Sequence, residues 1–233
     1  MKLFRAKVLS KQNLRGTFWY LNLQLVKPEQ INFQAGQFVM VTVDRKKNIR
    51  RAYSIASTPL IDNQIGLLIN VFPGGPGSQW ALSCQVGNEV LFSGVFGKFV
   101  LRDQDKNDLV FIATGAGIAP LKPMMDSLAE KKDQRSVELW WGLKRPEDIF
   151  WQDYFKGLGK KLKDFRLHQV ISQPKDNWQG RSGRVTHYLE KLSKQELAGK
   201  GFYICGQPAM IADVSKILLK KGVVKTNIFH EMF

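Results

Sequence analysis

Hydrophobic and polar residues alternate along the first hundred positions of the chain. In an extended strand over residues 18–25, one face would carry four large apolar side chains, Trp19, Leu21, Leu23 and Leu25. The other face would carry Phe18, Tyr20, Asn22 and Gln24. Similar runs, separated by turn residues, cover residues 3–9, 37–43, 52–56, 64–71 and 89–93. Six short strands with this spacing predict an antiparallel β-barrel.

The pattern changes after residue 102. Continuous apolar runs replace the alternation at residues 109–113, 137–141, 165–171 and 202–205. Helical stretches follow these runs at residues 120–131, 146–157, 185–192 and 208–220. Strands that alternate with helices predict a doubly wound parallel sheet. We therefore expect a β + α/β chain, with an antiparallel β-barrel domain over residues 1–103 and an α/β domain over residues 104–233.

Composition excludes several classes of protein. Of the 233 residues, 44% are hydrophobic and 24% are charged, which is typical of a globular chain and excludes disorder and fibrous repeats. The apolar runs are far shorter than the ~20 residues of a membrane helix, so we expect a cytoplasmic protein without a membrane span. The two cysteines, Cys84 and Cys205, are too few to ligate an iron–sulfur cluster. The histidines, His168, His187 and His230, lack metal-ligand spacing, and no metal site is predicted.

The net charge of +15 favours an anionic partner. Residues 1–103 contain 13 Lys and Arg against 5 Asp and Glu, whereas residues 104–233 contain 22 against 15. Such a field attracts nucleic acid, an anionic cofactor or an acidic protein. The chain has no run of five cations, and its aromatic residues do not interleave with basic ones, so nothing supports nucleic-acid binding.

A four-residue motif, Arg51, Ala52, Tyr53 and Ser54, marks the fourth predicted strand. An arginine fork binds phosphate, a tyrosine ring packs on an aromatic ligand, and a serine hydroxyl bonds to a ring nitrogen. These residue types on one strand fit a planar, phosphorylated ligand. An ordinary strand with an exposed arginine and a core tyrosine is the alternative interpretation.

Glycines gather over residues 74–78, where Gly75, Gly77 and Ser78 precede a short apolar stretch. Glycines let a backbone approach an anionic group closely. We expect Ser78 to cap a short helix whose free N–H groups face a diphosphate. A glycine-rich hairpin loop without a ligand would have the same sequence.

Two further loops follow buried strands of the predicted parallel sheet and precede helices. Both lie at the carboxyl edge of such a sheet, where helix N-termini attract phosphate. In the first loop, Pro120 suits the first helical position. Plain strand-to-helix turns and an inert buried thiol are the alternatives. The residues concerned are Thr114, Gly115, Gly117 and Pro120 in the first loop and Cys205, Gly206 and Pro208 in the second.

In this order and at these spacings, the motifs resemble those of the ferredoxin–NADP reductase superfamily of flavoproteins, over essentially the whole chain. The resemblance implies a barrel that binds FAD rather than FMN and an α/β domain that binds NADH or NADPH. It implies that Arg51 contacts the flavin phosphate, that Tyr53 packs on the isoalloxazine and that Ser54 lies near its N5. The diphosphate would lie at Gly75, Gly77 and Ser78. Residues 94–99 resemble the end of the family's barrel, and we interpret them as structural.

The resemblance also implies roles for the second domain. The loop with Thr114, Gly115, Gly117 and Pro120 would bind the pyrophosphate of the nicotinamide dinucleotide. The segment with Cys205, Gly206 and Pro208 would place its cysteine beside the nicotinamide ring. Glu231 and Phe233 would close the flavin pocket, and we expect Phe233 to move aside before hydride transfer. The expected catalytic residues are thus Ser54, Cys205, Glu231 and Phe233.

Three functions remain open from the sequence. The first is an NAD(P)H-dependent reductase that passes electrons through bound FAD to an acidic ferredoxin- or flavodoxin-type carrier, or to an oxygenase component, as the basic charge favours. The second is an NAD(P)H:flavin reductase with flavin as a dissociable substrate. The third is a non-catalytic electron-transfer subunit of a larger complex. NADH and NADPH both remain open, because Ser172 is followed by Gln173 rather than Arg, while Lys175, Arg181 and Arg145 could supply charge.

Overall fold

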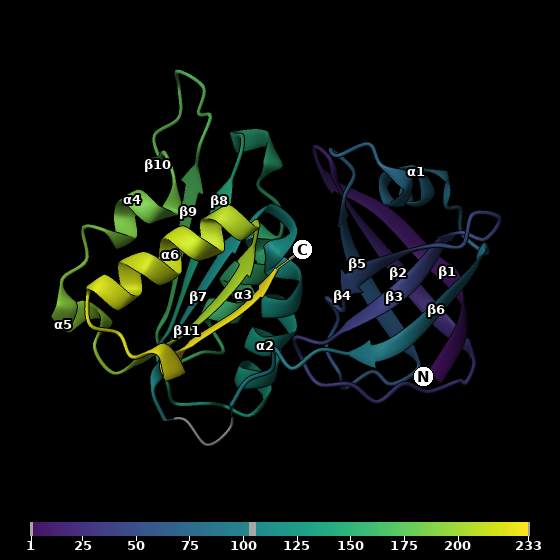
Figure 1. The fold of residues 1–233 in the computed structure, drawn as a ribbon, viewed down its shortest axis with the longest axis horizontal. Coiled ribbons are helices and arrows are strands. Elements are labelled where there is room, and N and C mark those ends of the chain that lie inside the picture. The colour runs from purple at the N-terminus through teal and green to yellow at the C-terminus, as the bar shows by residue number, and fades with distance from the viewer. Residues whose placement is uncertain (1, 103–105, 233) are drawn as a thin grey trace.

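The computed structural model describes residues 2–102 and 106–232, which form two domains side by side (Figure 1). The first domain is an antiparallel sheet of six strands in the order β4-β3-β6-β1-β2-β5. An antiparallel bridge between Ile55 and Leu67 brings the edges of this sheet together, so the predicted barrel is confirmed. Its elements are β1 (Lys2–Arg15), β2 (Phe18–Lys27), β3 (Phe38–Asp44), β4 (Ile49–Ser54), β5 (Gln64–Asn70), α1 (Pro76–Ser83) and β6 (Glu89–Phe96).

The second domain is a parallel sheet in the order β10-β9-β8-β7-β11-β12, with helices on both faces (Figure 1). Its strands are β7 (Asp108–Thr114), β8 (Val137–Leu143), β9 (Phe165–Ile171), β10 (Arg181–Ser182), β11 (Lys200–Gly206) and β12 (Ile228–Met232). Its helices are α2 (Ile118–Glu130), α3 (Gln152–Gly159), α4 (Val185–Leu189), α5 (Lys194–Leu197) and α6 (Pro208–Lys220). Single 3₁₀ turns occupy η1 (Gly115–Gly117), η2 (Pro146–Asp148) and η3 (Lys225–Asn227). The predicted doubly wound architecture is confirmed.

Some predicted details of the second domain are wrong. The first five residues of β9 are exposed or only partly buried. Its outer neighbour β10 has two residues, and these pair only with the last two residues of β9. The helix expected over residues 146–157 is split, since the chain leaves η2 in extended conformation and Trp151 adopts a left-handed φ of 58° before α3. The helix expected over residues 185–192 already ends at Leu189. The short strands β10 and β12 were not predicted.

The alternation in β2 sorts its side chains between the two domains. Leu21 and Leu23 are fully buried inside the barrel. Phe18 and Tyr20 point out of the barrel and pack with the apolar core between the parallel sheet and helices α2 and α3. The barrel therefore contributes side chains to the core of its neighbour. The predicted boundary between residues 103 and 104 lies outside the described residues.

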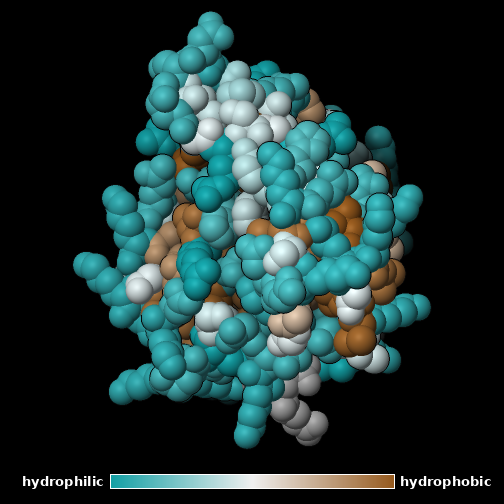
Figure 2. Space-filling model, turned by 90° about the vertical axis from the view of Figure 1, so that its left-hand side faces the viewer, coloured by the Kyte–Doolittle hydropathy of each residue, from teal (hydrophilic) through white to brown (hydrophobic). Residues whose placement is uncertain are grey.

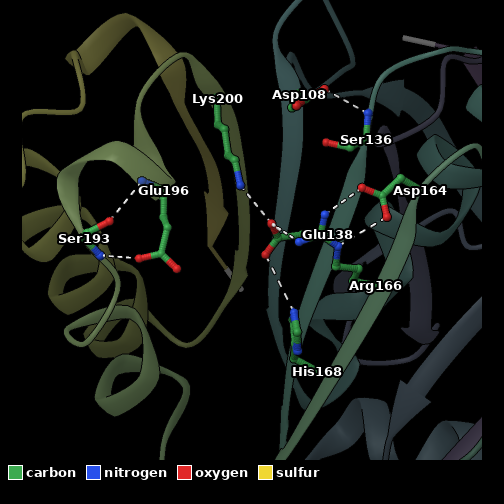
Figure 3. A network of polar contacts seen from close by, with 9 residues as sticks. All are labelled: Asp108, Ser136, Glu138, Asp164, Arg166, His168, Ser193, Glu196 and Lys200. Atoms are coloured by element: carbon green, nitrogen blue, oxygen red, sulfur yellow. Dashed lines mark hydrogen bonds and ion pairs between the residues drawn. The ribbon is translucent and has the colours of Figure 1, made fainter.

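A network of ion pairs joins the strands at the amino edge of the parallel sheet (Figure 3). Lys200 Nζ donates to Glu138 Oε1 at 2.8 Å, and His168 Nε2 lies 3.7 Å from Glu138 Oε2. The His168 and Lys200 contacts lower the pKa of Glu138 to about 2 against the opposing effect of its partial burial. The His168 ring also stacks on the Trp140 ring, with 4.0 Å between the ring centroids. The network stabilises the edge of the sheet opposite the predicted binding loops.

The outer side of the α/β domain is largely hydrophilic. Figure 2 shows this face, where apolar side chains appear only in separate areas among polar ones. Among the described residues, no helix is long and apolar enough to cross a membrane. The same residues contain no group of three or more His, Cys, Asp or Glu side chains that could hold a metal ion.

Candidate functional site

Helix α1 packs over the Arg51–Ser54 motif of β4, and Gly77 is the point of closest approach. A Cβ at position 77 would lie 2.4 Å from the Tyr53 hydroxyl oxygen and 3.4 Å from Arg51 Cγ. The Tyr53 ring also packs 5.9 Å from the Trp80 ring, and its burial raises the pKa of Tyr53 to about 12. Only a glycine lets the first turn of α1 lie this close to Tyr53, so two motifs 24 residues apart in the sequence form one site.

The N-terminus of α1 differs in detail from the prediction. The helix starts at Pro76 with Gly75 as its N-cap, and no side chain caps it. The predicted cap by Ser78 is therefore wrong, because proline favours the first helical position and starts the helix three residues earlier. Ser78 is instead buried within the first turn. The first-turn N–H groups and the exposed Arg51 remain available to a phosphate.

Glu231 connects the two domains. It lies on β12 in register with Cys205 of β11, and its carboxylate accepts a hydrogen bond from the Ser54 hydroxyl of the barrel. Burial raises the pKa of Glu231 to about 7, although the Ser54 hydrogen bond opposes this rise. Three predicted catalytic residues are thus brought together where β12 ends between the domains (Figure 1). Phe233 lies outside the described residues.

Cys205 is a neutral thiol in this environment. It is fully buried, and burial together with the nearby Glu231 carboxylate raises its pKa well above the ordinary value. A thiol is a nucleophile or a metal ligand only as thiolate. Cys205 can therefore shape the wall of the site but does not supply a reactive anion.

The two glycine loops of the parallel sheet lie in direct contact at its carboxyl edge. A Cβ at Gly117 would lie 2.1 Å from the carbonyl oxygen of Cys205, and a Cβ at Gly206 would lie 2.3 Å from Thr114 Oγ1. Glycine is required at both positions because larger residues would push the loops apart.

The prolines of the two loops behave differently. Pro208 begins α6, as predicted, and is exposed. Pro120 is buried and is the third residue of α2, which starts at Ile118. The prediction that Pro120 takes the first helical position is therefore wrong. The turn η1 takes up residues 115–117 and leads directly into the helix.

Two buried polar atoms lie at the junction between the barrel and the carboxyl edge of the parallel sheet, and they suggest that a ligand completes the site. Within the described part of the chain, neither Glu231 Oε2 nor Thr114 Oγ1 has a hydrogen-bond partner. Buried polar atoms in native proteins are rarely left unpaired. Ala52, the small second residue of the motif, is exposed on β4, so the strand leaves space along its outer side. The residues present therefore fit a flavin nucleotide on the barrel side and a nicotinamide dinucleotide on the sheet side.

Sequence reasoning missed residues that support the site from behind. Gly97, interpreted as structural, borders it, because a Cβ there would lie 3.5 Å from Glu231 Oε1. Trp141 Nε1 donates a hydrogen bond of 3.0 Å to the Gly115 carbonyl oxygen. Trp141 was predicted only as part of a buried strand, and no local pattern indicates that its indole reaches the loop after a neighbouring strand.

Comparisons with known proteins agree with this division into two halves. Residues 5–101 match the family "Oxidoreductase FAD-binding domain", and residues 111–216 match the family "Oxidoreductase NAD-binding domain". The chain is 33% identical over 208 residues to the anthranilate 1,2-dioxygenase electron transfer component of Acinetobacter baylyi, covering 88% of this chain and 59% of that protein. It is 30% identical to a component protein of the Na(+)-translocating NADH-quinone reductase of Actinobacillus pleuropneumoniae, over 100% of this chain and 68% of the relative. Both relatives thus contain segments that this chain does not match.

Solved structures give the same result. The cytochrome P450 reductase GcoB of Amycolatopsis superposes with a TM-score of 0.90 at 26% identity, over 100% of this chain and 70% of that one. A ferredoxin NADP+ reductase of Neisseria gonorrhoeae, solved with bound FAD and NADP, superposes with a TM-score of 0.85 at 26% identity, over 100% and 99% of the two chains. The site, the two matched halves and these structures together show that the chain belongs to the FAD- and NAD(P)-binding oxidoreductases of the ferredoxin–NADP reductase superfamily.

Proposed function

We propose that this chain is an NAD(P)H-dependent flavoprotein reductase that passes electrons from bound FAD to a separate carrier or oxygenase component. The observation that carries the proposal is the contact of Ser54, on the barrel, with Glu231, which lies in register with Cys205 on the parallel sheet. A bound flavin supplies chemistry that the side chains lack, since it accepts two electrons as hydride from NAD(P)H and releases them singly. A relative that shares 33% identity is itself an electron transfer component of a dioxygenase.

The barrel residues bind and orient the flavin in this proposal. The exposed guanidinium of Arg51 and the uncapped first turn of α1 provide N–H donors for the diphosphate. The Tyr53 hydroxyl stays protonated because its pKa is about 12, so the tyrosine presents a neutral aromatic surface. Gly77 keeps α1 close to this surface.

Glu231, in contact with Ser54, is the group that exchanges protons at the junction between the domains in this proposal. A carboxyl with a pKa of about 7 exchanges a proton readily at neutral pH, which suits a general acid or base. The Ser54 hydroxyl interacts with this carboxyl group, and Oε2 has no hydrogen-bond partner among the described residues. The neutral Cys205 thiol beside them adds no competing charge.

We further propose that the electron acceptor is acidic. Five of the seven residues 45–51, which form the turn after β3 and the first half of β4, are Lys or Arg, and the segment ends at Arg51 of the Tyr53 motif. Arg45 is paired with Glu89 at 2.8 Å, whereas Lys46, Lys47 and Arg50 are exposed and form no ion pair within the described residues. A cationic surface beside the flavin site would attract an acidic protein and orient its redox centre toward the flavin.

The salt dependence of electron transfer tests this part of the proposal. The rate of reduction of an acidic [2Fe–2S] ferredoxin should fall as ionic strength rises, because the Debye length shrinks to about 10 Å at 0.1 M salt. The rate with an uncharged quinone should stay nearly constant. Replacing Lys46 and Lys47 by Glu should slow the ferredoxin reaction and leave the quinone reaction unchanged. A ferredoxin rate that depends on neither salt nor these charges would rule out an acidic acceptor at this surface.

A further inference from the structure

The barrel contributes one aromatic ring directly to the loop that follows β7. Phe18, at the start of β2, is 4% exposed and belongs to the core of the α/β domain. Its ring faces Gly115 across the space of one methyl group, because a Cβ at Gly115 would be in ordinary contact with it, 3.8 Å from Phe18 Cζ and 3.9 Å from Cε1. We propose that Phe18 is a positioning residue that fixes the Gly115 loop and thereby sets the affinity for the nicotinamide dinucleotide. The inference rests on the proposed function, in which this loop binds the pyrophosphate.

Gly115 depends on its surroundings for a fixed conformation. Its φ is +53°, in the left-handed region, and it has no side chain that could anchor it. The Trp141 indole holds its carbonyl oxygen at 3.0 Å, and the Phe18 ring faces the space that a Gly115 side chain would occupy. The peptide that begins η1 is therefore held by one hydrogen bond from its own domain and bordered by one ring from the other.

Phe18 is itself held in place by an aromatic cluster. Its ring centroid lies 5.1 Å from that of Phe150, and the Phe150 ring meets the Trp141 ring edge-on at 4.8 Å. The rings of Phe18 on β2, Trp141 on β8 and Phe150 after η2 thus form one cluster beside the Gly115 loop. Ring pairs at these distances are favourable and restrict each other's rotamers.

The hairpin that carries Phe18 is fixed to the same domain at its turn. A Cβ at Gly16, which has a φ of +50°, would lie 2.5 Å from Asp148 Oδ1. Asp148 accepts a hydrogen bond of 3.0 Å from the Arg145 backbone N–H, which stabilises the turn η2. The hairpin therefore cannot shift away from the α/β domain without losing this close packing. Phe18, two residues after Gly16, is thereby kept beside the Gly115 loop.

The consequence concerns binding rather than stability alone. Thr114 Oγ1, one residue before Gly115, is buried and unpartnered within the described chain and faces the junction. A loop that is already held in its binding conformation binds its ligand more tightly, because less ordering is needed on binding. Loss of the Phe18 ring would leave Gly115 free to change its φ, and the loop N–H groups would lose their alignment toward a pyrophosphate.

Three variants of the flavin-loaded protein test the inference. We expect Phe18→Ala to raise the dissociation constant of NAD+ or NADP+, measured by titration calorimetry, and the KM of the reduced cofactor by about tenfold. Phe18→Leu, which keeps part of the contact, should raise both by about threefold. In both variants, kcat at saturating cofactor and the flavin content should stay within about twofold of wild type. If Phe18→Ala fails to fold, the Phe18→Leu variant decides the question.

Leu158→Ala is the matched control. Leu158 lies in the same core on α3 and is 4% exposed, like Phe18. We expect this variant to lower the melting temperature but to bind the dinucleotide as wild type does. Unchanged dinucleotide affinity in the Phe18 variants, or an equal loss in Leu158→Ala, would show that Phe18 only packs the core. Failure of the wild-type protein to oxidise NAD(P)H would instead refute the proposed function.

Discussion

Introducing a methyl group at Gly77 should disrupt the flavin site, and removing the Tyr53 hydroxyl should restore it. In Gly77→Ala the new Cβ would lie 2.4 Å from the Tyr53 hydroxyl oxygen, far below a normal contact distance. In Gly77→Ala/Tyr53→Phe that oxygen is absent, and the nearest remaining atoms are Arg51 Cγ at 3.4 Å and Tyr53 Cζ at 3.6 Å. The geometry therefore predicts a strong clash in the single variant and an ordinary contact in the double variant.

The magnitude follows from the cost of overpacking. One extra methyl group in a well-packed site destabilises a protein by about 1–3 kcal/mol. For a chain of 233 residues this corresponds to a fall in melting temperature of roughly 2–12 °C. Because Tyr53→Phe removes the clashing atom, the two substitutions should couple by about 1–2 kcal/mol in a double-mutant cycle.

Urea unfolding of the wild type, both single variants and the double variant measures this coupling, and the flavin retained after gel filtration reports on the site itself. Gly75→Ala is the matched control in the same loop, because a Cβ there meets nothing within 4 Å and the φ of −73° suits alanine. Its stability should stay within about 1 kcal/mol of wild type. Independent, additive effects of Gly77→Ala and Tyr53→Phe would refute the packing of α1 on Tyr53.

Three further predictions concern stability. Because the pKa of Glu231 rises from 4.5 unfolded to about 7 folded, the flavin-free protein should lose stability as pH rises between these values, and Glu231→Gln should remove this loss in urea titrations at pH 5 and pH 8. The pKa of Glu138 is lowered from 4.5 to about 2, so its contribution to folding stability is fully present above pH 4.5 and is lost as the pH falls toward 2. Glu138→Gln should melt at a lower temperature than wild type at pH 7, and its melting temperature should fall less than that of wild type between pH 7 and pH 3. Melting temperatures of the two proteins that run parallel across this pH range would contradict this assignment. Gly117→Ala should cost about 3 kcal/mol in denaturant unfolding, because its Cβ would meet the Cys205 carbonyl oxygen at 2.1 Å and a backbone neighbour cannot rotate away; wild-type stability would disprove this packing.

Local periodicity was sufficient to predict both domains. The alternation over residues 18–25 gave the strand and also separated the barrel-facing leucines from Phe18. It could not give the neighbours of Phe18, because Gly115 and Phe150 are 97 and 132 residues further along the sequence. Helix starts were less predictable. Because Pro76 takes the first helical position, α1 starts before Ser78. The turn η1 leads into α2 at Ile118, so Pro120 lies inside that helix.

The sequence named candidate residues for the site but did not indicate how they are arranged. Motifs and resemblance selected Ser54, Cys205 and Glu231, which the structure brings together through the parallel pairing of β11 with β12. β12 itself was not predicted, since a strand of five residues with a polar His-Glu pair has little pattern of its own. The proximity of Gly97 to Glu231 depends on how the two domains pack, which no local signal indicates.

The most direct test of flavin binding and hydride transfer is an absorption spectrum of the purified protein after extensive gel filtration, recorded before and after anaerobic addition of NADH or NADPH. The proposed function predicts flavin bands that remain with the protein and bleach when the nicotinamide is added. A protein that loses its flavin on the column but reduces added flavin would instead be a flavin reductase. A colourless protein that takes up no FAD when it is supplied would contradict the assignment of Arg51, Tyr53 and Gly77 to a flavin site.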